Sequence, residues 1–401
     1  MKKVGLIVLI LVILLLACEN KETKVEDAFR KIEDKARGTK VTLYMKDAPY
    51  NVINWVDLFL AKLLAEEFDI TLVRIPKDSA EYLEELKKEK ESGTEQGSAD
   101  LLWIYGEDFR QAKVQNLLYG PFTNKLPNYV NYVDPPAVEL DYGFPTEGYE
   151  SPFGKNQFVM IYNSWKIKSP PDTIKYLTEW IKMNPGRFTY PQPPDKVGSA
   201  FIRQTLYALT GGYSQYTKDF DDAFFKEKTA VLWKYLNEIK PYLWQSGEVY
   251  PPTSENLDKL LNKDIVDYSM TYSMVHTEHK IASKEFSEDI KTYIMKDSSI
   301  SYINYLAIPF NAPNIPGAMV VTDLVLDIGV QYNKNLIAQC GDYTVLSMDR
   351  LSSSEQAKFE TIDVGKTAFS IAELNEYAVP ELSAKYIEIL NTEWRKNVLG
   401  Y

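Results

Sequence analysis

The residues best suited to metal chemistry stand together in the segment His276-Thr277-Glu278-His279. Two imidazoles three residues apart, beside a carboxylate, are a set that could clamp a metal ion. Spacing fixes no third ligand, and the H-E-x-x-H order of zinc proteases is absent. The sequence therefore favours a solvated polar loop over a metal site at this position.

Motifs for covalent or nucleotide chemistry are absent from the 401 residues. Neither a G-x-S-x-G nucleophile elbow nor a Walker A loop nor a G-x-G-x-x-G fingerprint occurs. Carboxylates are abundant, so a pair of the glycosidase kind stays open, but no spacing singles one out. We therefore expect a protein that is not an enzyme and that needs no cofactor.

Binding chemistry is better defined, first at a helix that begins near Gly198 and Ser199. The rigid, proline-rich segment that starts at Tyr190 leads directly into it. Free N–H groups and the positive dipole end would hold an anionic or polar group there, and Arg203 lies one turn further on. The alternative is that Ser199 only caps the helix and Arg203 pairs at the surface.

A second candidate region follows the third expected strand, at Trp103, Tyr105, Gly106 and Glu107. Ligands of open α/β sheets bind at the carboxyl ends of strands. Two aromatic faces beside a negative charge suit an aromatic or cationic solute. The alternative places Trp103 in the core and makes Glu107 a charge at a helix N-terminus.

Further ligand contacts are expected where polar and aromatic residues fall in turns or at the end of a strand. These candidates are Lys46, Tyr50 and Asn51 after the first strand, Trp244 in a proline-flanked loop, and Tyr268, Tyr272 and Ser273 at the close of a later strand.

The N-terminus resembles a lipoprotein leader. Lys2 and Lys3 precede an apolar run from Val4 to Ala17, and Cys18 follows at once. This run is shorter than the ~20 apolar residues that a transmembrane helix needs. We expect cleavage before Cys18, lipidation of its thiol, and an extracytoplasmic protein anchored to a bacterial membrane by acyl chains. An ordinary secretory signal with a chance cysteine is the alternative.

Composition excludes several other classes of protein. Hydrophobic residues make up 45% and charged residues 25%, which is typical of a folded chain rather than a disordered one. The formal charge of −11 argues against nucleic acid as a partner. Two cysteines and two histidines are too few for a zinc ribbon or a haem protein.

Apolar strands alternate with helices along the chain, which predicts an α/β fold with a parallel sheet covered on both faces. Expected strands lie at 41–45, 70–75, 99–105, 157–162, 265–272, 290–295 and 303–308, and expected helices at 25–36, 51–67, 78–91, 173–183, 198–209, 221–239, 317–326, 354–358 and 381–397. The proline-rich segment 119–152 has no helical period, and we expect an ordered loop region there.

This order of elements predicts two α/β lobes joined by hinge crossovers, with a ligand cleft between them. The expected division is a leader at 1–17, a tether and N-terminal helix at 18–37, a first lobe at 38–152 plus 303–345, and a second lobe at 153–302 plus 346–401.

Several segments resemble a known family when taken in order. They are 97–109 (GSADLLWIYGEDF), 152–158 (PFGKNQF), 185–191 (PGRFTYP), 198–203 (GSAFIR), 266–272 (VDYSMTY), 308–313 (IPFNAP) and 317–320 (GAMV). Together they are similar to the extracytoplasmic solute-binding proteins of ABC importers, in the group named as thiamine-type transport binding proteins. One turn departs from that group, because Lys46 to Asn51 stand where a Trp-Gly-Gly-type turn is usual.

The resemblance implies a periplasmic-binding-protein type II fold and a monomer that delivers a small solute to ABC permease and ATPase subunits. Thiamine or a related cationic aromatic compound is the first ligand that it implies, with a polar organic anion or a sugar as the alternative. A cell-surface interaction or adhesin lipoprotein is the competing function. Neighbouring permease and ATPase genes would separate the two functions.

Overall fold

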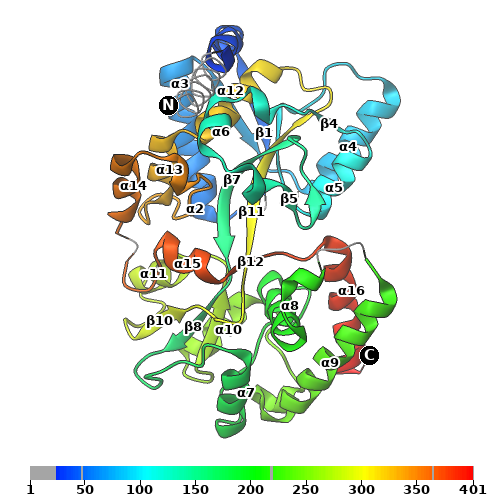
Figure 1. Ribbon diagram of the computed structural model, residues 1–401, viewed down its shortest axis with the longest axis vertical. Helices are drawn as coiled ribbons and strands as arrows, with labels where there is room; N and C mark the ends of the chain where they lie inside the picture. The colour runs from blue at the N-terminus through cyan, green and yellow to red at the C-terminus, as the bar shows by residue number, and fades with distance from the viewer. Residues whose placement is uncertain (1–23, 47, 217–219, 364, 401) are drawn as a thin grey trace, which may run out of the picture.

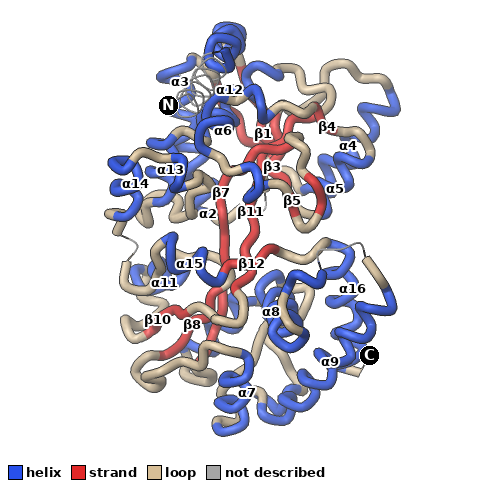
Figure 2. The backbone as a smooth tube through the Cα atoms, viewed as in Figure 1, coloured by secondary structure: helices blue, strands red, loops and turns tan. Residues whose placement is uncertain are grey.

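The computed structural model describes residues 24–46, 48–216, 220–363 and 365–400. Two lobes are stacked along the long axis of the molecule, and two long strands, β7 (Glu150–Gln157) and β11 (Ser299–Pro309), run from one to the other (Figure 1). Helices surround the strands of both lobes (Figure 2). The cleft expected between two lobes therefore has to lie beside these connecting strands.

The sheet of the first lobe has the strand order β12-β11-β3-β1-β2. Its strands β1 (Lys40–Tyr44), β2 (Thr71–Ile75) and β3 (Leu101–Ile104) pair in parallel, as their continuous apolar sequences predict. The long strand β11 is antiparallel to β3. The carboxyl ends of β1 and β3 consequently point toward the second lobe.

The second lobe has a three-stranded sheet in the order β10-β8-β9. Both pairings are antiparallel, so the parallel arrangement expected from strand and helix alternation holds only in the first lobe. The strands are β8 (Val159–Asn163), β9 (Tyr268–Thr271) and β10 (Ile290–Tyr293). The helices α7 to α10 lie between β8 and β9 in the chain, and their apolar residues share one core with this small sheet.

The edge of β11 opposite β7 carries two different partners. β3 covers this edge at Tyr305 to Ala307, and β12 (Ala378–Pro380) covers it at Ser299 to Ser301. Neither strand reaches residues 302–304 on that edge. A short stretch of β11 at the junction of the lobes therefore faces side chains rather than another strand.

The remaining elements agree with most of the expected boundaries to within a few residues. In the first lobe they are helix 24–36, α2 (Tyr50–Asn54), η1 (Trp55–Leu60), α3 (Ala61–Phe68), α4 (Ser79–Ser92), α5 (Glu107–Val114), α12 (Ile315–Val325), α13 (Ile328–Asn335), η7 (Met348–Arg350) and α14 (Ser353–Glu360). In the second they are α7 (Ile174–Met183), α8 (Lys196–Thr210), η4 (Tyr213–Tyr216), α9 (Asp222–Ile239), η5 (Lys240–Tyr242), η6 (Trp244–Gly247), α10 (Ser254–Asn262), α11 (His276–Ala282), α15 (Ile371–Tyr377), α16 (Ala384–Trp394) and η8 (Arg395–Leu399).

The segment expected to be an ordered loop is built from short elements. They are β4 (Leu118–Tyr119), η2 (Thr123–Lys125), α6 (Pro127–Tyr132), η3 (Pro135–Val138), β5 (Leu140–Asp141) and β6 (Phe144–Pro145), followed by β7. The β5–β6 hairpin brings Tyr142 to the junction of the lobes.

One part of the expected lobe division differs from the packing. Leu346, Leu351 and Phe359 are buried in the same core as β3 and the upper part of β11. The Phe359 ring lies 5.9 Å from the ring of Tyr332 on α13. Residues 346–362 thus pack on the first lobe, where we had expected the second, and we propose that the lobe boundary follows them.

No single helix in the described ranges is long and apolar enough to cross a membrane. By length and composition alone, α12 and α13 pass together as a pair bent by 62°. Every residue of α12 from Gly317 to Val325 is buried in the first lobe.

Candidate ligand-binding cleft

Four tyrosine rings meet beside the uncovered stretch of β11. Tyr302 lies on β11, Tyr105 follows β3, Tyr272 follows β9, and Tyr142 is in the β5–β6 turn. The centroid of the Tyr302 ring lies 5.0 Å from that of Tyr272, 5.8 Å from that of Tyr105 and 6.2 Å from that of Tyr142. Residues from both lobes and from the connecting strand therefore form one aromatic box.

The ammonium group of Lys196, the first residue of α8, lies in this box. Its Nζ is 3.7 Å from the ring centroid of Tyr302, 4.6 Å from that of Tyr105 and 5.7 Å from that of Tyr272. Among the described residues, no carboxylate forms an ion pair with Nζ and no oxygen accepts a hydrogen bond from it. Ring faces are thus the main contacts of this cation.

The surroundings of Lys196 disfavour its charge. The residue keeps access to the solvent of the cleft, but protein atoms enclose the ammonium, and this desolvation lowers its pKa to about 7. The charge of Glu381 acts in the opposite direction, as does that of Asp141 when it is ionised, and the charge of Arg203 adds to the lowering. Lys196 is therefore a cation that a small change in the cleft can neutralise.

A buried ion pair lies behind the box. The Arg203 guanidinium donates from Nε and one terminal nitrogen to the two carboxylate oxygens of Glu381, both at 2.6 Å. Tyr272 donates its hydroxyl to Glu381 at 3.0 Å, and Arg203 also donates to the Ser199 hydroxyl at 2.5 Å. Burial lowers the pKa of Arg203, but the charge of Glu381, its hydrogen bond to Arg203 and the neighbouring Tyr272 together raise the pKa above its ordinary value. Both charges are satisfied internally.

Asp141 connects the β5–β6 hairpin, which carries Tyr142, to the turn that follows β3. Gly106 donates its backbone N–H to the Asp141 carboxylate and has a φ of 62°, which glycine adopts without strain. A Cβ at position 106 would lie 3.3 Å from the Tyr142 ring. Burial raises the pKa of Asp141 to about 8, so this carboxyl is mostly protonated at neutral pH.

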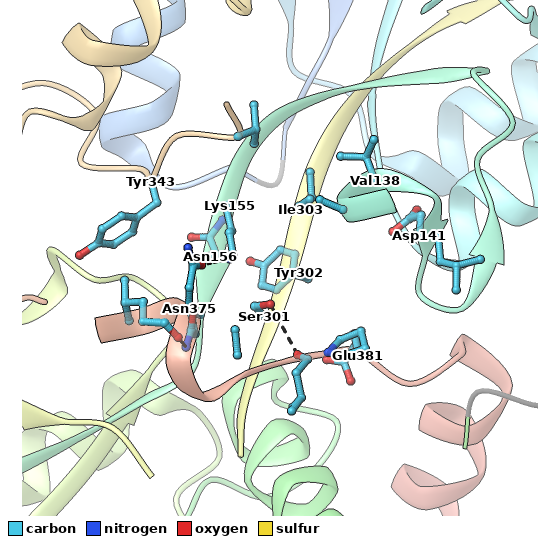
Figure 3. Close-up of a pocket in the computed structure, with 18 of the residues that line it drawn as sticks. Val138, Asp141, Lys155, Asn156, Ser301, Tyr302, Ile303, Tyr343, Asn375 and Glu381 are labelled. Carbon is cyan, nitrogen blue, oxygen red and sulfur yellow. Dashed lines mark hydrogen bonds between the residues drawn. The ribbon is translucent and has the colours of Figure 1, made fainter. Parts of the chain in front are cut away.

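A cavity of about 690 Å³ adjoins the box (Figure 3). Tyr142 and Tyr302 belong to both, Glu381 also lines the cavity, and the cavity continues along the connecting strands to Lys155 and Asn375. The Lys155 ammonium donates to the side-chain oxygen of Asn375 at 2.8 Å. This volume lies within the range of ~300–1,000 Å³ usual for small-molecule sites.

The comparisons with known proteins identify the family. Residues 60–319 match the family model described as bacterial extracellular solute-binding protein. The chain is 33% identical over 338 residues to the protein YnjB of Escherichia coli strain K12. The aligned residues make up 83% of this chain and 86% of the relative. The chain belongs to the bacterial extracellular solute-binding protein family. It is therefore the solute-binding component of an ABC importer, it acts outside the cytoplasm, and it is not an enzyme.

Solved structures confirm the periplasmic-binding-protein fold. The spermidine/putrescine substrate-binding protein PotD of Streptococcus pneumoniae aligns with a TM-score of 0.61 and 15% identity, over 89% of this chain and 100% of that one. AfuA of Actinobacillus pleuropneumoniae, described with fructose 6-phosphate bound, aligns with a TM-score of 0.55 and 12% identity, over 90% and 98%. Solutes this different show that the fold does not select the ligand.

Several residues expected to bind ligand do meet at the cleft of this solute-binding protein. Tyr105 and Tyr272 form walls of the box, and Gly106 holds the Asp141 carboxylate. Ser199 and Arg203 lie behind it in the ion-pair network. These residues lie together because strand ends and helix starts converge between the lobes, and their contact with a solute stays a prediction.

Trp103 corrects one of those expectations. Its ring is 5% exposed and packs edge-on at 4.7 Å against Phe153 in the core of the first lobe. Trp103 belongs to β3, every residue of which is buried, whereas Tyr105 follows the end of that strand. The Glu107 carboxylate already has a partner within the protein, because Arg110 forms an ion pair with it at 2.5 Å and lowers its pKa.

The anion site expected at the start of α8 is occupied by the chain itself. Asp195 caps the helix, and its Oδ1 accepts from the N–H groups of Val197 and Gly198, both at 2.9 Å. A Cβ on Gly198 would lie 1.9 Å from the carbonyl oxygen of Pro191, so glycine is required there for close packing. With Arg203 paired to Glu381, neither group is available to a solute anion.

Other expected contacts lie away from the box. Tyr190 and Tyr268 are fully buried in the core of the second lobe, and Trp244 packs against it because the loop that carries it folds back onto Phe188. Ser273 binds Thr271 through its backbone N–H. In the first lobe, Lys46 pairs with Asp78, Asn51 donates to the Cys340 carbonyl, and Tyr50 is 78% exposed.

The two histidines contact different partners. His276 lies 2.7 Å from Asp258, and His279 lies 3.2 Å from the Ile337 carbonyl. The described ranges contain no group of three or more His, Cys, Asp or Glu side chains arranged for a metal ion.

Sequence reasoning missed Lys196, Asp141, Tyr142, Tyr302 and Glu381. Lys196 directly follows the Asp195 cap and precedes the Gly198-Ser199 motif, so its place at the start of α8 was a usable signal. Tyr302 gave no such signal, because the sequence of β11 has the pattern of an ordinary buried strand. Glu381 reaches the box only through the pairing of β12 with β11, which short-range patterns do not encode.

Proposed function

We propose that this chain is a lipid-anchored binding protein that captures a small organic cation with a flat ring system, for which thiamine is the first candidate. The observation that carries the proposal is the enclosure of the Lys196 ammonium by the rings of Tyr105, Tyr272 and Tyr302. A box that holds an ammonium of the protein can hold the cation of a solute by the same ring quadrupoles.

The box is also placed to couple binding to closure of the lobes. Tyr105 belongs to the first lobe, Tyr272 to the second, and Tyr302 to the connecting strand β11. A solute between these rings touches both lobes at once. Such contacts favour the closed arrangement that a permease would recognise. A cation that contacts a ring gains about 0.5 to 2 kcal/mol per site, depending on desolvation.

The alternative solute, a polar anion, has fewer donors here than the sequence suggested. Asp195 takes two N–H groups at the start of α8, and Glu381 takes the Arg203 guanidinium. Lys196 is the positive group that an anion would still meet in the box. A cationic solute gains the aromatic walls without needing those donors.

The anchor rests on Cys18, which lies outside the described residues. Its support is the apolar run Val4–Ala17 directly before it. The helix at 24–36 packs on the first lobe through Phe29 and Ala36, and only five residues separate Cys18 from that helix. An acylated Cys18 would therefore hold the first lobe next to the membrane, within reach of a permease.

Native mass spectrometry of freshly purified protein tests this function, followed by titration calorimetry with the solute that is released and with thiamine. The proposal expects one organic cation per chain and saturable thiamine binding. An anionic or uncharged solute that binds tightly, with no response to thiamine, would exclude the cation class and leave the importer role intact.

A further inference from the structure

Lys196 has an unusual position for a lysine at the start of a helix. Such side chains ordinarily extend into water or pair with an acid. Here the ammonium lies over one ring at 3.7 Å and beside two others, with no ion pair or hydrogen bond among the described residues. The chain thus places its own cation at the point that the proposed function gives to the solute.

We propose that Lys196 is a resident cation of the solute site: its ammonium fills the tyrosine box while the protein is empty, and the cationic group of the solute replaces it there. This inference rests on the proposed function. It makes Lys196 a specificity-determining residue, because a solute has to compete successfully with a tethered ammonium.

The geometry allows the exchange. Lys196 has a flexible four-carbon stem and stands at the first residue of α8, where no preceding turn confines its side chain. The residue is also exposed to solvent. Among the described residues the ammonium has ring contacts and the more distant charge of Glu381, but no hydrogen bond and no ion pair, so its departure breaks neither.

Two cations cannot share the box without repulsion. The charged groups that face Lys196 are Glu381 and Arg203, which neutralise one another, and Asp141, whose carboxyl is hydrogen-bonded to Gly106. No further carboxylate of the described residues pairs with a second positive charge there. When the solute enters, Lys196 either moves into the cleft solvent or gives its proton to water and stays as a neutral amine.

The second route has a measurable signature. Desolvation lowers the pKa of Lys196 to about 7, so at neutral pH its proton is easily lost. An arriving cation lowers this pKa further, and the proton passes from Nζ to the solvent. Binding of a cation should then release up to one proton per chain, whereas binding of an anion would hold the proton on Lys196 and take protons up.

The test compares wild type with Lys196→Met, which keeps the length of the side chain and removes its charge. The probes are thiamine and tetramethylammonium, a minimal cation. We expect Lys196→Met to bind the probe cation at least about tenfold more tightly. Calorimetry in two buffers of different ionisation enthalpy should show that wild type exchanges protons on binding, with release if Lys196 stays as a neutral amine and uptake if its ammonium moves into water, and that this exchange is smaller in the variant. Lys175→Met is the matched control, because Lys175 lies 5.9 Å from an exposed ring, that of Tyr176, outside the cleft.

The outcomes separate this inference from the proposed function. If wild type binds thiamine and Lys196→Met binds it equally or more weakly, the function stands and the resident-cation inference is wrong. If Lys196→Met binds tetramethylammonium more tightly than wild type but neither binds thiamine, the inference stands and the thiamine-type assignment is wrong. If neither protein binds either cation, or if thiamine monophosphate binds and loses affinity in Lys196→Met while thiamine does not bind, Lys196 is not a competitor and the inference is overturned.

Discussion

Arg203 and Glu381 form a two-fold hydrogen-bonded ion pair across 178 residues of sequence, with both bonds at 2.6 Å. Arg203 lies on α8, and Glu381 directly follows β12, the short strand that pairs with β11. The ion pair therefore joins a helix of the second lobe to the segment at the edge of β11. Both side chains are almost completely buried. Removal of the charge of either residue would leave the other charge unpaired in the protein interior.

Glu381→Gln should therefore destabilise the protein by about 3 to 5 kcal/mol, which urea unfolding measures. The double variant Arg203→Met, Glu381→Leu removes both charges and should unfold at a urea concentration closer to that of wild type. Asp222→Asn is the control, because its partner Lys226 is exposed and a surface pair contributes about 0 to 1 kcal/mol. Equal stability of Glu381→Gln and wild type would contradict the assigned role of the pair.

Asp141 should make stability depend on pH. Burial raises its pKa to about 8 from the ordinary value of 3.8. Between those pH values the folded protein holds a proton that the unfolded chain has lost, so the free energy of unfolding falls as pH rises. Asp141→Asn cannot ionise and its side-chain oxygen can still accept from Gly106. We expect it to be more stable than wild type at pH 8, by about 1 kcal/mol or more, and less dependent on pH.

Urea unfolding at pH 5, 6.5 and 8 checks this expectation, with the exposed Asp289→Asn as the control. Part of the pH slope should remain in Asp141→Asn, because burial also raises the pKa of Glu150. A wild-type protein whose stability rises steadily from pH 5 to 8, with Asp141→Asn parallel to it, would show that Asp141 ionises normally.

Two neighbouring aromatic residues should have opposite phenotypes. Tyr105 lies in the box, and Tyr105→Leu or Tyr302→Leu should weaken binding of the released solute by about tenfold with little loss of stability. Trp103→Ala should instead cost about 3 to 5 kcal/mol of stability, since it empties a core position. Tyr176→Leu, on an exposed surface of α7, is the control for loss of a tyrosine. Unchanged affinity in both box variants would contradict the aromatic site.

The contrast between Trp103 and Tyr105 shows how far sequence reasoning reaches. The third strand, its end and the aromatic pair were all predictable from an apolar run followed by glycine. Trp103 and Tyr105 are two residues apart and would share one face of a continued strand, so which ring leaves the core depends on where the strand stops. The structure ends β3 at Ile104, which buries Trp103 and releases Tyr105.

Long-range pairing explains most of what could not be predicted. Arg203 was singled out for its place one turn into a helix, but its partner lies near the C-terminus of the chain. The helix was predicted to begin at Gly198, but it begins two residues earlier at Lys196, and its cap Asp195 satisfies the donors that an anion would need. Local patterns locate such donors. Only the folded chain shows whether they are already occupied.

Replacement of Cys18 tests the anchor without touching the cleft. Cys18→Ala removes the thiol that acylation requires, so the protein should move from the membrane fraction to the soluble extracytoplasmic fraction. Stable retention needs more than one acyl chain, because a single chain binds a bilayer only marginally. Mass spectrometry of wild type should show a lipid-modified N-terminus at residue 18, and Cys340→Ala is the control, since that thiol is buried in the first lobe. Solute affinity should be the same in the soluble Cys18→Ala protein as in detergent-extracted wild type. A Cys18→Ala protein that still sediments with membranes, together with a wild type that carries no lipid, would show that another segment provides the attachment.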